Sequence, residues 1–74
     1  MKVKIKTWSE MEKEFGLDEV GDINCEYSFV DIMENNLPED RIIETVKDDD
    51  GDPVWFTSES SGWNISNDMI KEKL

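Results

Sequence analysis

The sequence predicts a single α+β domain in which two helices are followed by an antiparallel meander of short strands. Three observations support this. Residues 2–6 alternate charged and apolar side chains, which is the period of a half-buried strand. Two apolar stripes with helical spacing follow before residue 38. After residue 40, short apolar runs alternate with turn-forming residues. The expected order over residues 1–74 is β-α-α-β-β-β-α, with no linker or repeat.

The first helix is expected directly after the N-terminal strand. Thr7 and Glu10 have the spacing of a capping box, and Gly16 suits a left-handed helix end. The apolar stripe between them is formed by Trp8, Met11 and Phe15.

A second helix is expected from Ser28, which we interpret as its N-cap, to the stretch before Pro38. Its apolar stripe is formed by Phe29, Ile32, Met33 and Leu37.

Three strands are expected at residues 41–47, 54–57 and 63–65, separated by turns at 48–52 and 58–62. With the first strand they would form a strongly bent antiparallel sheet resembling a small SH3-like barrel. A last short helix is expected after Ser66, with Met69, Ile70 and Leu74 on its apolar side. Trp8 and Phe56 are the expected core aromatics, and Cys25 is expected to be a small buried apolar residue.

The charge restricts the classes of partner. The 74 residues hold 19 acidic and 8 basic side chains and no histidine, for a net charge of -11. Such a chain repels nucleic acid and anionic membranes, and it suits a basic partner protein. There is no run of apolar residues long enough for a membrane span, and the start lacks the apolar core of a signal peptide. We therefore expect a cytoplasmic protein.

The side chains for catalysis and for metal binding are scarce. Without histidine, serine–histidine and cysteine–histidine nucleophile pairs are excluded, as are zinc sites built on histidine. We expect no enzymatic activity, no cofactor and no metal site. The acidic run 48–52 suggests calcium, but placing Gly51 sixth in an EF-hand loop puts Val46 first and Thr57 twelfth, so both ends fail. A solvated hairpin turn is the preferred interpretation.

The candidate binding residues are acidic and aromatic. Residues 8–40 contain one base, Lys13, and include the acidic face formed by Glu10, Glu12, Glu14, Asp18, Glu19 and Asp22. This face is either a solvated helix surface or a mimic of nucleic-acid phosphates that binds a basic groove. Trp55 alternates with Phe56 and is expected to face outward, so Trp55 and Trp63 are candidate apolar anchors.

A second set of residues is basic. Lys4, Lys6 and Arg41 are alternative ligand-binding residues that would hold a phosphate together with a tryptophan. The competing interpretation is that Lys2, Lys4 and Lys6 form the solvated face of an edge strand, where lysine prevents aggregation.

Two segments suggest a family. The opening M-K-V-K-I-K-T-W-x-x-M-x-x-E-F-G-L-D-x-x-G-D-I-N-C and the closing W-x-I-S-x-D-M-I resemble small accessory proteins of tailed bacteriophages and prophages. The resemblance covers residues 1–25 and 63–70. It implies a protein made in the cytoplasm of an infected bacterium, and it implies no activity for any residue.

Three functions remain open at this point. The first is a non-catalytic inhibitor of a host defence protein, CRISPR-like or otherwise DNA-binding, that covers the basic nucleic-acid surface of its partner. The second is an oligomeric sponge for a nucleotide immune signal. The third is a structural or regulatory adaptor of the phage. The oligomeric state is open as well, and a dimer is one of the options.

Overall fold

Strand β1 (Lys2–Ile5) is the central strand of one of two antiparallel sheets in the computed structural model, which describes all 74 residues. Its neighbours are β2 (Ile42–Glu44) and β6 (Ile70–Lys73), in the order β2-β1-β6. The alternation predicted from the sequence is present, because Val3 and Ile5 are buried while Lys2 is exposed. The predicted edge-strand position is wrong, because both edges of β1 are paired.

The second sheet continues from the first. Strand β3 (Val46–Lys47) follows β2 after a single residue and pairs with β4 (Pro53–Trp55), which pairs with β5 (Trp63–Asn64). The residue between the sheets, Thr45, is buried, and its backbone N–H and its hydroxyl both donate hydrogen bonds to the Met1 carbonyl. The α+β class is therefore confirmed, and the predicted single bent sheet is two three-stranded sheets joined at Thr45.

Helix α1 (Trp8–Phe15) begins and ends at the predicted residues. Thr7 accepts the Glu10 N–H, the Glu10 carboxylate accepts the Thr7 N–H, and Gly16 follows with a φ of 74°. Helix α2 (Asp31–Asn36) is shorter than predicted. Its N-cap is Val30 and makes no side-chain cap, whereas the predicted cap Ser28 lies in a tight turn with a φ of 41°. Neither helix is long and apolar enough to cross a membrane.

One core lies between the helices and the sheets. Trp8 packs at its edge, with its ring 6.0 Å from that of Phe29, and is partly buried. The buried residues of the core are Val3, Ile5, Met11, Ile23, Phe29, Met33, Ile43, Trp55, Ile65 and Met69.

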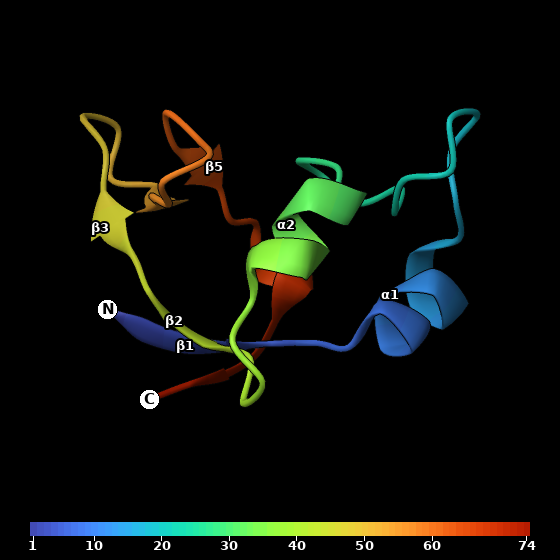
Figure 1. Ribbon diagram of the computed structural model, residues 1–74, viewed down its shortest axis with the longest axis horizontal. Coiled ribbons are helices and arrows are strands. Elements are labelled where there is room, and N and C mark those ends of the chain that lie inside the picture. Colours follow the sequence, from blue (N-terminus) through green and yellow to red (C-terminus); the bar gives the residue numbers. More distant parts are fainter.

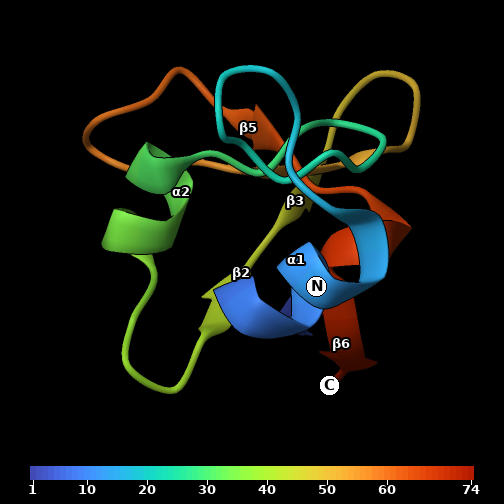
Figure 2. The ribbon, with the colours of Figure 1, turned by 90° about the vertical axis from the view of Figure 1, so that its right-hand side faces the viewer.

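The loops gather on one side of the molecule. Figures 1 and 2 show the first sheet and both termini in the lower part of the molecule, while the loops of residues 17–28, 48–52 and 57–62 project from its upper side. In Figure 1 these loops are spread along the longest axis, with the tip of the 17–28 loop on the right and the 48–52 turn on the left. We call these three segments the loop end. The lower end, with β1, β2, β6 and the connection at residues 38–41, is called the sheet end.

The C-terminal helix is a wrong prediction. Residues 67–69 form a single 3-10 turn, η1 (Asn67–Met69), and the chain then continues as strand β6. A helix of one or two turns has little stability of its own. The C-terminal residues therefore pair with the free edge of β1 as strand β6 instead of forming a helix. Met69 is buried, as predicted.

The sides predicted for Trp55 and Phe56 are reversed. Trp55 is 6% exposed and Phe56 is 58% exposed. Strand β4 lies between β3 and β5, and both Val54 and Trp55 are buried, so both of its faces are covered. The alternation of a strand predicts opposite sides for Trp55 and Phe56. It does not apply to Phe56, because β4 ends at Trp55. The Phe56 ring instead lies over Gly62, where a Cβ atom would come within 2.9 Å of it.

Replacing Met69 tests the corrected C-terminus. Met69 is fully buried, so Met69→Ala should lower the free energy of unfolding by about 2–5 kcal/mol, measured by urea denaturation. Ile32→Ala, at a residue that is 54% exposed on α2, should change it by about 0.5 kcal/mol or less. Equal effects of the two substitutions would contradict the observed packing.

Candidate protein-binding surface

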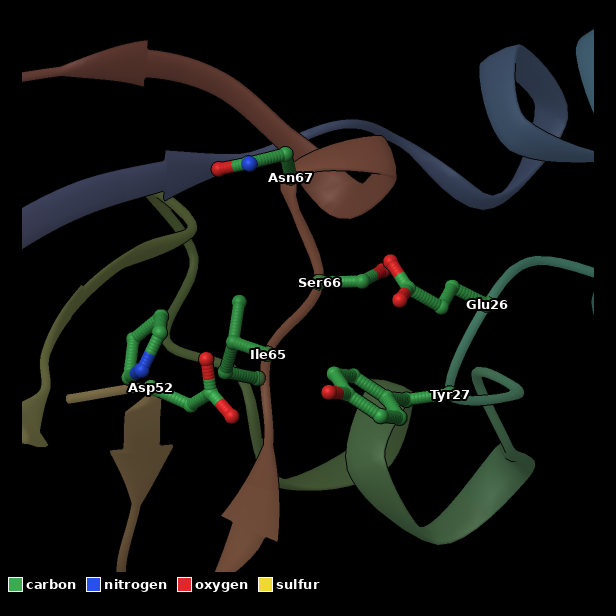
Figure 3. A pocket seen from close by; sticks show the side chains of 7 residues that line it. Glu26, Tyr27, Asp52, Ile65, Ser66 and Asn67 are labelled. Atoms are coloured by element: carbon green, nitrogen blue, oxygen red, sulfur yellow. The ribbon is translucent and has the colours of Figure 1, made fainter. Parts of the chain in front are cut away.

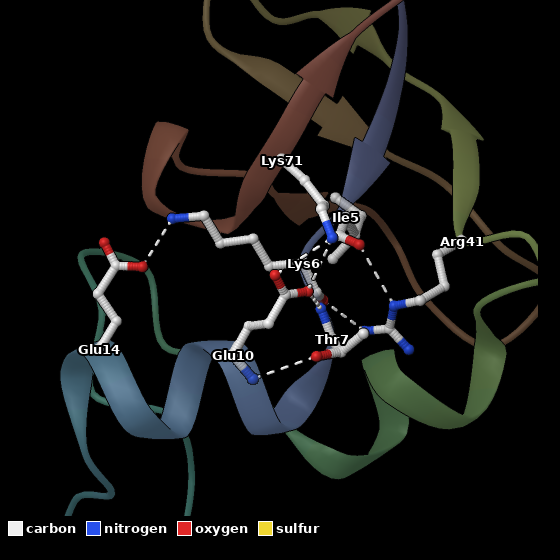
Figure 4. Close-up of polar contacts among 7 residues, drawn as sticks. All are labelled: Ile5, Lys6, Thr7, Glu10, Glu14, Arg41 and Lys71. Atoms are coloured by element: carbon white, nitrogen blue, oxygen red, sulfur yellow. Dashed lines mark hydrogen bonds and ion pairs between the residues drawn. The ribbon is translucent and has the colours of Figure 1, made fainter.

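Three cations of the sheet end, Lys6, Arg41 and Lys71, form ion pairs within the chain. Lys6 donates to Glu14 at 2.9 Å, and Lys71 lies 3.2 Å from a Glu10 oxygen (Figure 4). Arg41 forms a two-pronged ion pair with Glu34.

Arg41 has further internal partners. Its guanidinium also donates to the backbone carbonyls of Ile5 and Lys6 (Figure 4). These contacts hold Arg41 at a φ of 61°, a region that L-residues rarely adopt. The alternative ligand site therefore has only Lys4 without an internal partner, because the charged groups of Lys6 and Arg41 bind carboxylates and carbonyls.

The predicted acidic face includes groups that stabilise the fold. Glu10 closes the capping box and pairs with Lys71, Glu12 accepts from the Trp8 indole at 3.2 Å, and Glu14 pairs with Lys6. The structure brings these three residues together on α1. It also gives each of them an internal partner.

The other three acidic candidates lie in the loop after α1. The Asp18 carboxylate accepts the backbone N–H groups of Val20 and Asp22 and so shapes the loop. Glu19 is exposed and Asp22 is half-buried, and neither side chain makes a hydrogen bond or an ion pair. These two carboxylates are free to meet a partner.

Most free carboxylates lie at the loop end. The four ion pairs of the chain engage Glu10, Glu14, Glu34 and Glu44, and none of these residues belongs to it. The loop end contains no lysine or arginine. It contains nine carboxylates, namely Asp18, Glu19, Asp22, Glu26, Asp48, Asp49, Asp50, Asp52 and Glu59. This end is therefore strongly negative and has no internal ion pair, with the exposed Lys47 directly before the 48–52 turn.

Exposed apolar side chains lie in or beside the same segments. Val20 is 80% exposed, Phe56 58%, Leu17 47% and Tyr27 41%. Exposed aromatic and apolar side chains surrounded by a polar rim are typical of protein-binding sites. The prediction that an aromatic anchor accompanies the carboxylates therefore fits Tyr27 and Phe56 better than Trp55.

The two predicted tryptophan anchors pack on each other. Their ring centroids are 5.2 Å apart, and Trp55 and Trp63 lie directly opposite in the β4–β5 ladder. Trp63 is half-buried and retains an exposed part, whereas Trp55 belongs to the core. The prediction that Trp55 faces outward as an anchor is therefore wrong, because the two rings pack against each other across the strands.

The acidic turn 48–52 is a tight hairpin turn, as predicted. The Asp48 carboxylate accepts the N–H groups of Asp50 and Asp52, each at 2.9 Å. Carboxylate oxygens of Asp48, Asp50 and Asp52 lie within 4.8 Å of one another. One Asp48 oxygen is thus used to fold the turn, and acidic proximity alone does not make a metal site.

Tyr27 lies close enough to this turn for the carboxylates of the turn to affect its pKa. The carboxylates of Asp52 and Glu26 raise the pKa of Tyr27 above its ordinary value of 10.0, with smaller contributions from Asp48 and Asp50. Segments far apart in the sequence thus meet at one negative surface. Single-residue patterns did not indicate Tyr27 or Glu26, because their importance depends on the fold, which places the carboxylates of the 48–52 turn near the Tyr27 hydroxyl.

Cys25 is only partly buried and packs against the core. Burial raises the pKa of its thiol above 9.0, which disfavours the reactive thiolate, and the nearby Ser66 hydroxyl opposes this shift only in part. The prediction that Cys25 is a small buried apolar residue is therefore correct in its packing, but its burial is only partial.

Acid titration tests the role of Glu10. Its pKa is lowered from 4.5 to about 2, first because its carboxylate accepts the Thr7 backbone N–H and then because of Lys71. A lowered folded-state pKa stabilises the fold above pH 4.5, and this contribution is lost as the pH falls from 4.5 towards 2. Glu10→Gln should reduce the loss of urea resistance across that window. An unchanged pH profile would contradict this role.

Titration of the single tyrosine tests the field at the loop end. Asp52→Asn should lower the pKa of Tyr27 towards 10.0, because it removes the largest repulsion on the tyrosinate. Added KCl should act in the same direction by screening. Ultraviolet absorbance of the tyrosinate measures both effects, and a pKa insensitive to both changes would contradict the negative surface.

Comparison with known proteins adds no relative: no family model, curated protein or solved structure matches the chain. The resemblance to phage accessory proteins stays a prediction, and the geometry of the loop end carries the functional argument.

Proposed function

We propose that the chain is a non-catalytic protein-binding domain whose loop end docks on a basic, nucleic-acid-binding surface of another protein. The observation that carries this proposal is the loop end itself. Nine carboxylates lie on these three segments, which contain no basic residue and no ion pair, and the exposed Lys47 directly before the 48–52 turn is the one neighbouring cation in the sequence. A basic surface would supply the missing counter-charges and speed the encounter between the proteins.

The position of the exposed apolar groups supports a protein partner. Val20 and Tyr27 lie within the loop end, and Phe56 directly precedes its third segment. Carboxylates alone would attract any cationic surface, whereas apolar side chains among them favour one that is shaped to fit.

The resemblance to phage proteins suggests the setting. Within that setting the partner is a host defence protein, CRISPR-like or otherwise DNA-binding, whose basic channel the domain would obstruct in the bacterial cytoplasm. The nucleotide-sponge alternative has weaker support, because Lys6 and Arg41 are bound internally. The phage adaptor is compatible with the same surface and differs only in its partner.

A capture experiment with matched baits tests the proposal. The full chain is immobilised and exposed to a nuclease-treated lysate of the bacterial host at low and moderate salt. The baits are the unmodified chain, Glu19→Lys, Asp49→Lys and Glu39→Lys. Each substitution reverses one exposed carboxylate whose side chain makes no hydrogen bond or ion pair, two at the loop end and one at the sheet end.

We expect a basic nucleic-acid-binding protein on the unmodified and Glu39→Lys baits at low salt. Its amount should fall about three- to tenfold on Glu19→Lys and Asp49→Lys, because each change puts a cation against the basic surface. Moderate salt should weaken the capture. Equal capture by all four baits, or no captured protein, would contradict the proposal.

A further inference from the structure

A small surface cavity, which we call the hollow, lies between three segments that are distant in the sequence, residues 26–27, 52–53 and 65–67. It has a volume of about 190 Å³ and is lined by Glu26, Tyr27, Asp52, Pro53, Ile65, Ser66 and Asn67. Figure 3 shows the Tyr27 hydroxyl directed towards the Asp52 side, and the Glu26 and Ser66 side chains extending towards each other. Residues of the second sheet and the loop end thus share one concave site.

The polar groups of this hollow lack partners. The carboxylates of Glu26 and Asp52 take part in no ion pair, and neither side chain makes a hydrogen bond. Ser66 is 3% exposed, and its hydroxyl makes no hydrogen bond although the oxygen is fully buried. The Cys25 thiol nearby is only a weak donor and acceptor. Buried hydroxyls are normally paired, so an unpaired one in the wall of a hollow points to a polar group that is absent from the free chain.

The charge of the hollow selects the sign of this group. Its lining contains two carboxylates and no base, and the acidic turn lies next to it through Asp52. The pKa of Tyr27 is raised by the same carboxylates, which indicates a negative potential at its hydroxyl. A cationic ligand is therefore favoured.

The shape and the lining select the kind of cation. A guanidinium is planar and has five N–H donors, which suit two separated carboxylates. Its face packs well on an aromatic ring such as Tyr27, and the methylene groups of an arginine suit Pro53 and Ile65. An ammonium group offers neither the planar face nor the forked donors.

We propose that this hollow receives the guanidinium of one arginine from the partner protein, held between Asp52 and Glu26 against the ring of Tyr27. The proposal rests on the proposed function for the source of the arginine. The site itself is tested with a free probe, so that the two can fail separately.

The probe is N-acetyl-arginine amide, titrated into the ¹⁵N-labelled full chain and followed by NMR. N-acetyl-lysine amide and KCl at matched ionic strength are the controls. We expect saturable shifts at Tyr27, Ile65 and Asn67 with a dissociation constant of about 1 mM, which is ordinary for so small a ligand. The lysine probe should bind at least about threefold more weakly.

Variants of one turn separate the site from general charge. Asp52→Asn should weaken the arginine probe at least about fivefold, because it removes a lining carboxylate that makes no hydrogen bond. Asp49→Asn removes one negative charge from the same turn, but Asp49 does not line the hollow. This variant should change the affinity for the arginine probe less than twofold. Ser66→Ala should weaken the probe without unfolding the chain, as checked by tryptophan fluorescence.

Three results would overturn the proposal. Shifts that do not saturate, or that are equal with KCl, would reduce the hollow to a general negative surface. Equal binding by Asp52→Asn would move the site elsewhere. Calcium chloride that displaces the arginine probe at lower concentration, with shifts centred on residues 48–52, would assign the turn to a divalent cation instead.

The bait experiment distinguishes this proposal from the broader one. An Asp52→Asn bait should capture less of the basic partner than an Asp49→Asn bait does, since the latter keeps the hollow intact. Undiminished capture by Asp52→Asn would overturn the arginine anchor while the loop-end surface still stands. Arginine binding without any captured protein would instead contradict the proposed function.

Discussion

Strand β1 pairs on both edges, and this pairing places five of the eight basic residues in β1, directly after β1 or in β6, namely Lys2, Lys4, Lys6, Lys71 and Lys73. With β2 on one side and β6 on the other, Val3 and Ile5 enter the core, and the lysine-bearing strand is fixed at the sheet end. Lys6 follows β1 and reaches Glu14 of α1, while Lys71 of β6 reaches Glu10. The N-terminal amine adds a hydrogen bond to Thr45. The same pairing therefore builds the first sheet and brings two of its lysines, Lys6 and Lys71, within reach of carboxylates on α1.

The remaining loops are left with carboxylates alone. Repulsion among uncompensated like charges lowers the stability of a compact chain. A domain of this size has little stability in reserve. A surface that costs stability without serving the fold is typical of a functional site. The exposed Tyr27 and Phe56 are also typical of a functional site. Neither belongs to the buried core, and each is available to a partner.

Local patterns predicted the first 16 residues well. The alternation of β1 and the capping box of α1 depend on residues within one turn or one strand, so the sequence contains all the information. Predictions failed where a distant segment decides. Ile70 and Leu74 have helical spacing, yet the free edge of β1 draws the C-terminus into a strand. Trp55 is buried because it packs in the core and against the Trp63 ring, which alternation within β4 does not reveal.

The candidate surface, like the fold, was predicted where local sequence decides and was missed where distant segments meet. Composition located an excess of acid in residues 8–40, but the fold gives Glu10, Glu12 and Glu14 internal partners. Glu19 and Asp22 remain free to meet a partner. The turn 48–52 was interpreted as a solvated hairpin, and the effect of its carboxylates on the pKa of Tyr27 makes it part of a larger surface. Chain folding, rather than local sequence, brings these segments to one end.

The most direct test of this account is the free energy of unfolding as a function of KCl concentration. Uncompensated repulsion at the loop end predicts that stability rises with added KCl, because screening relieves the repulsion. It also predicts that a Glu19→Gln, Asp49→Asn double variant is more stable at low salt and less dependent on salt. Glu72 faces Lys4 in the β1–β6 ladder, and a Glu39→Gln, Glu72→Gln variant should show no such gain. Stability that falls or stays constant with KCl, or equal gains in both double variants, would contradict the central claim.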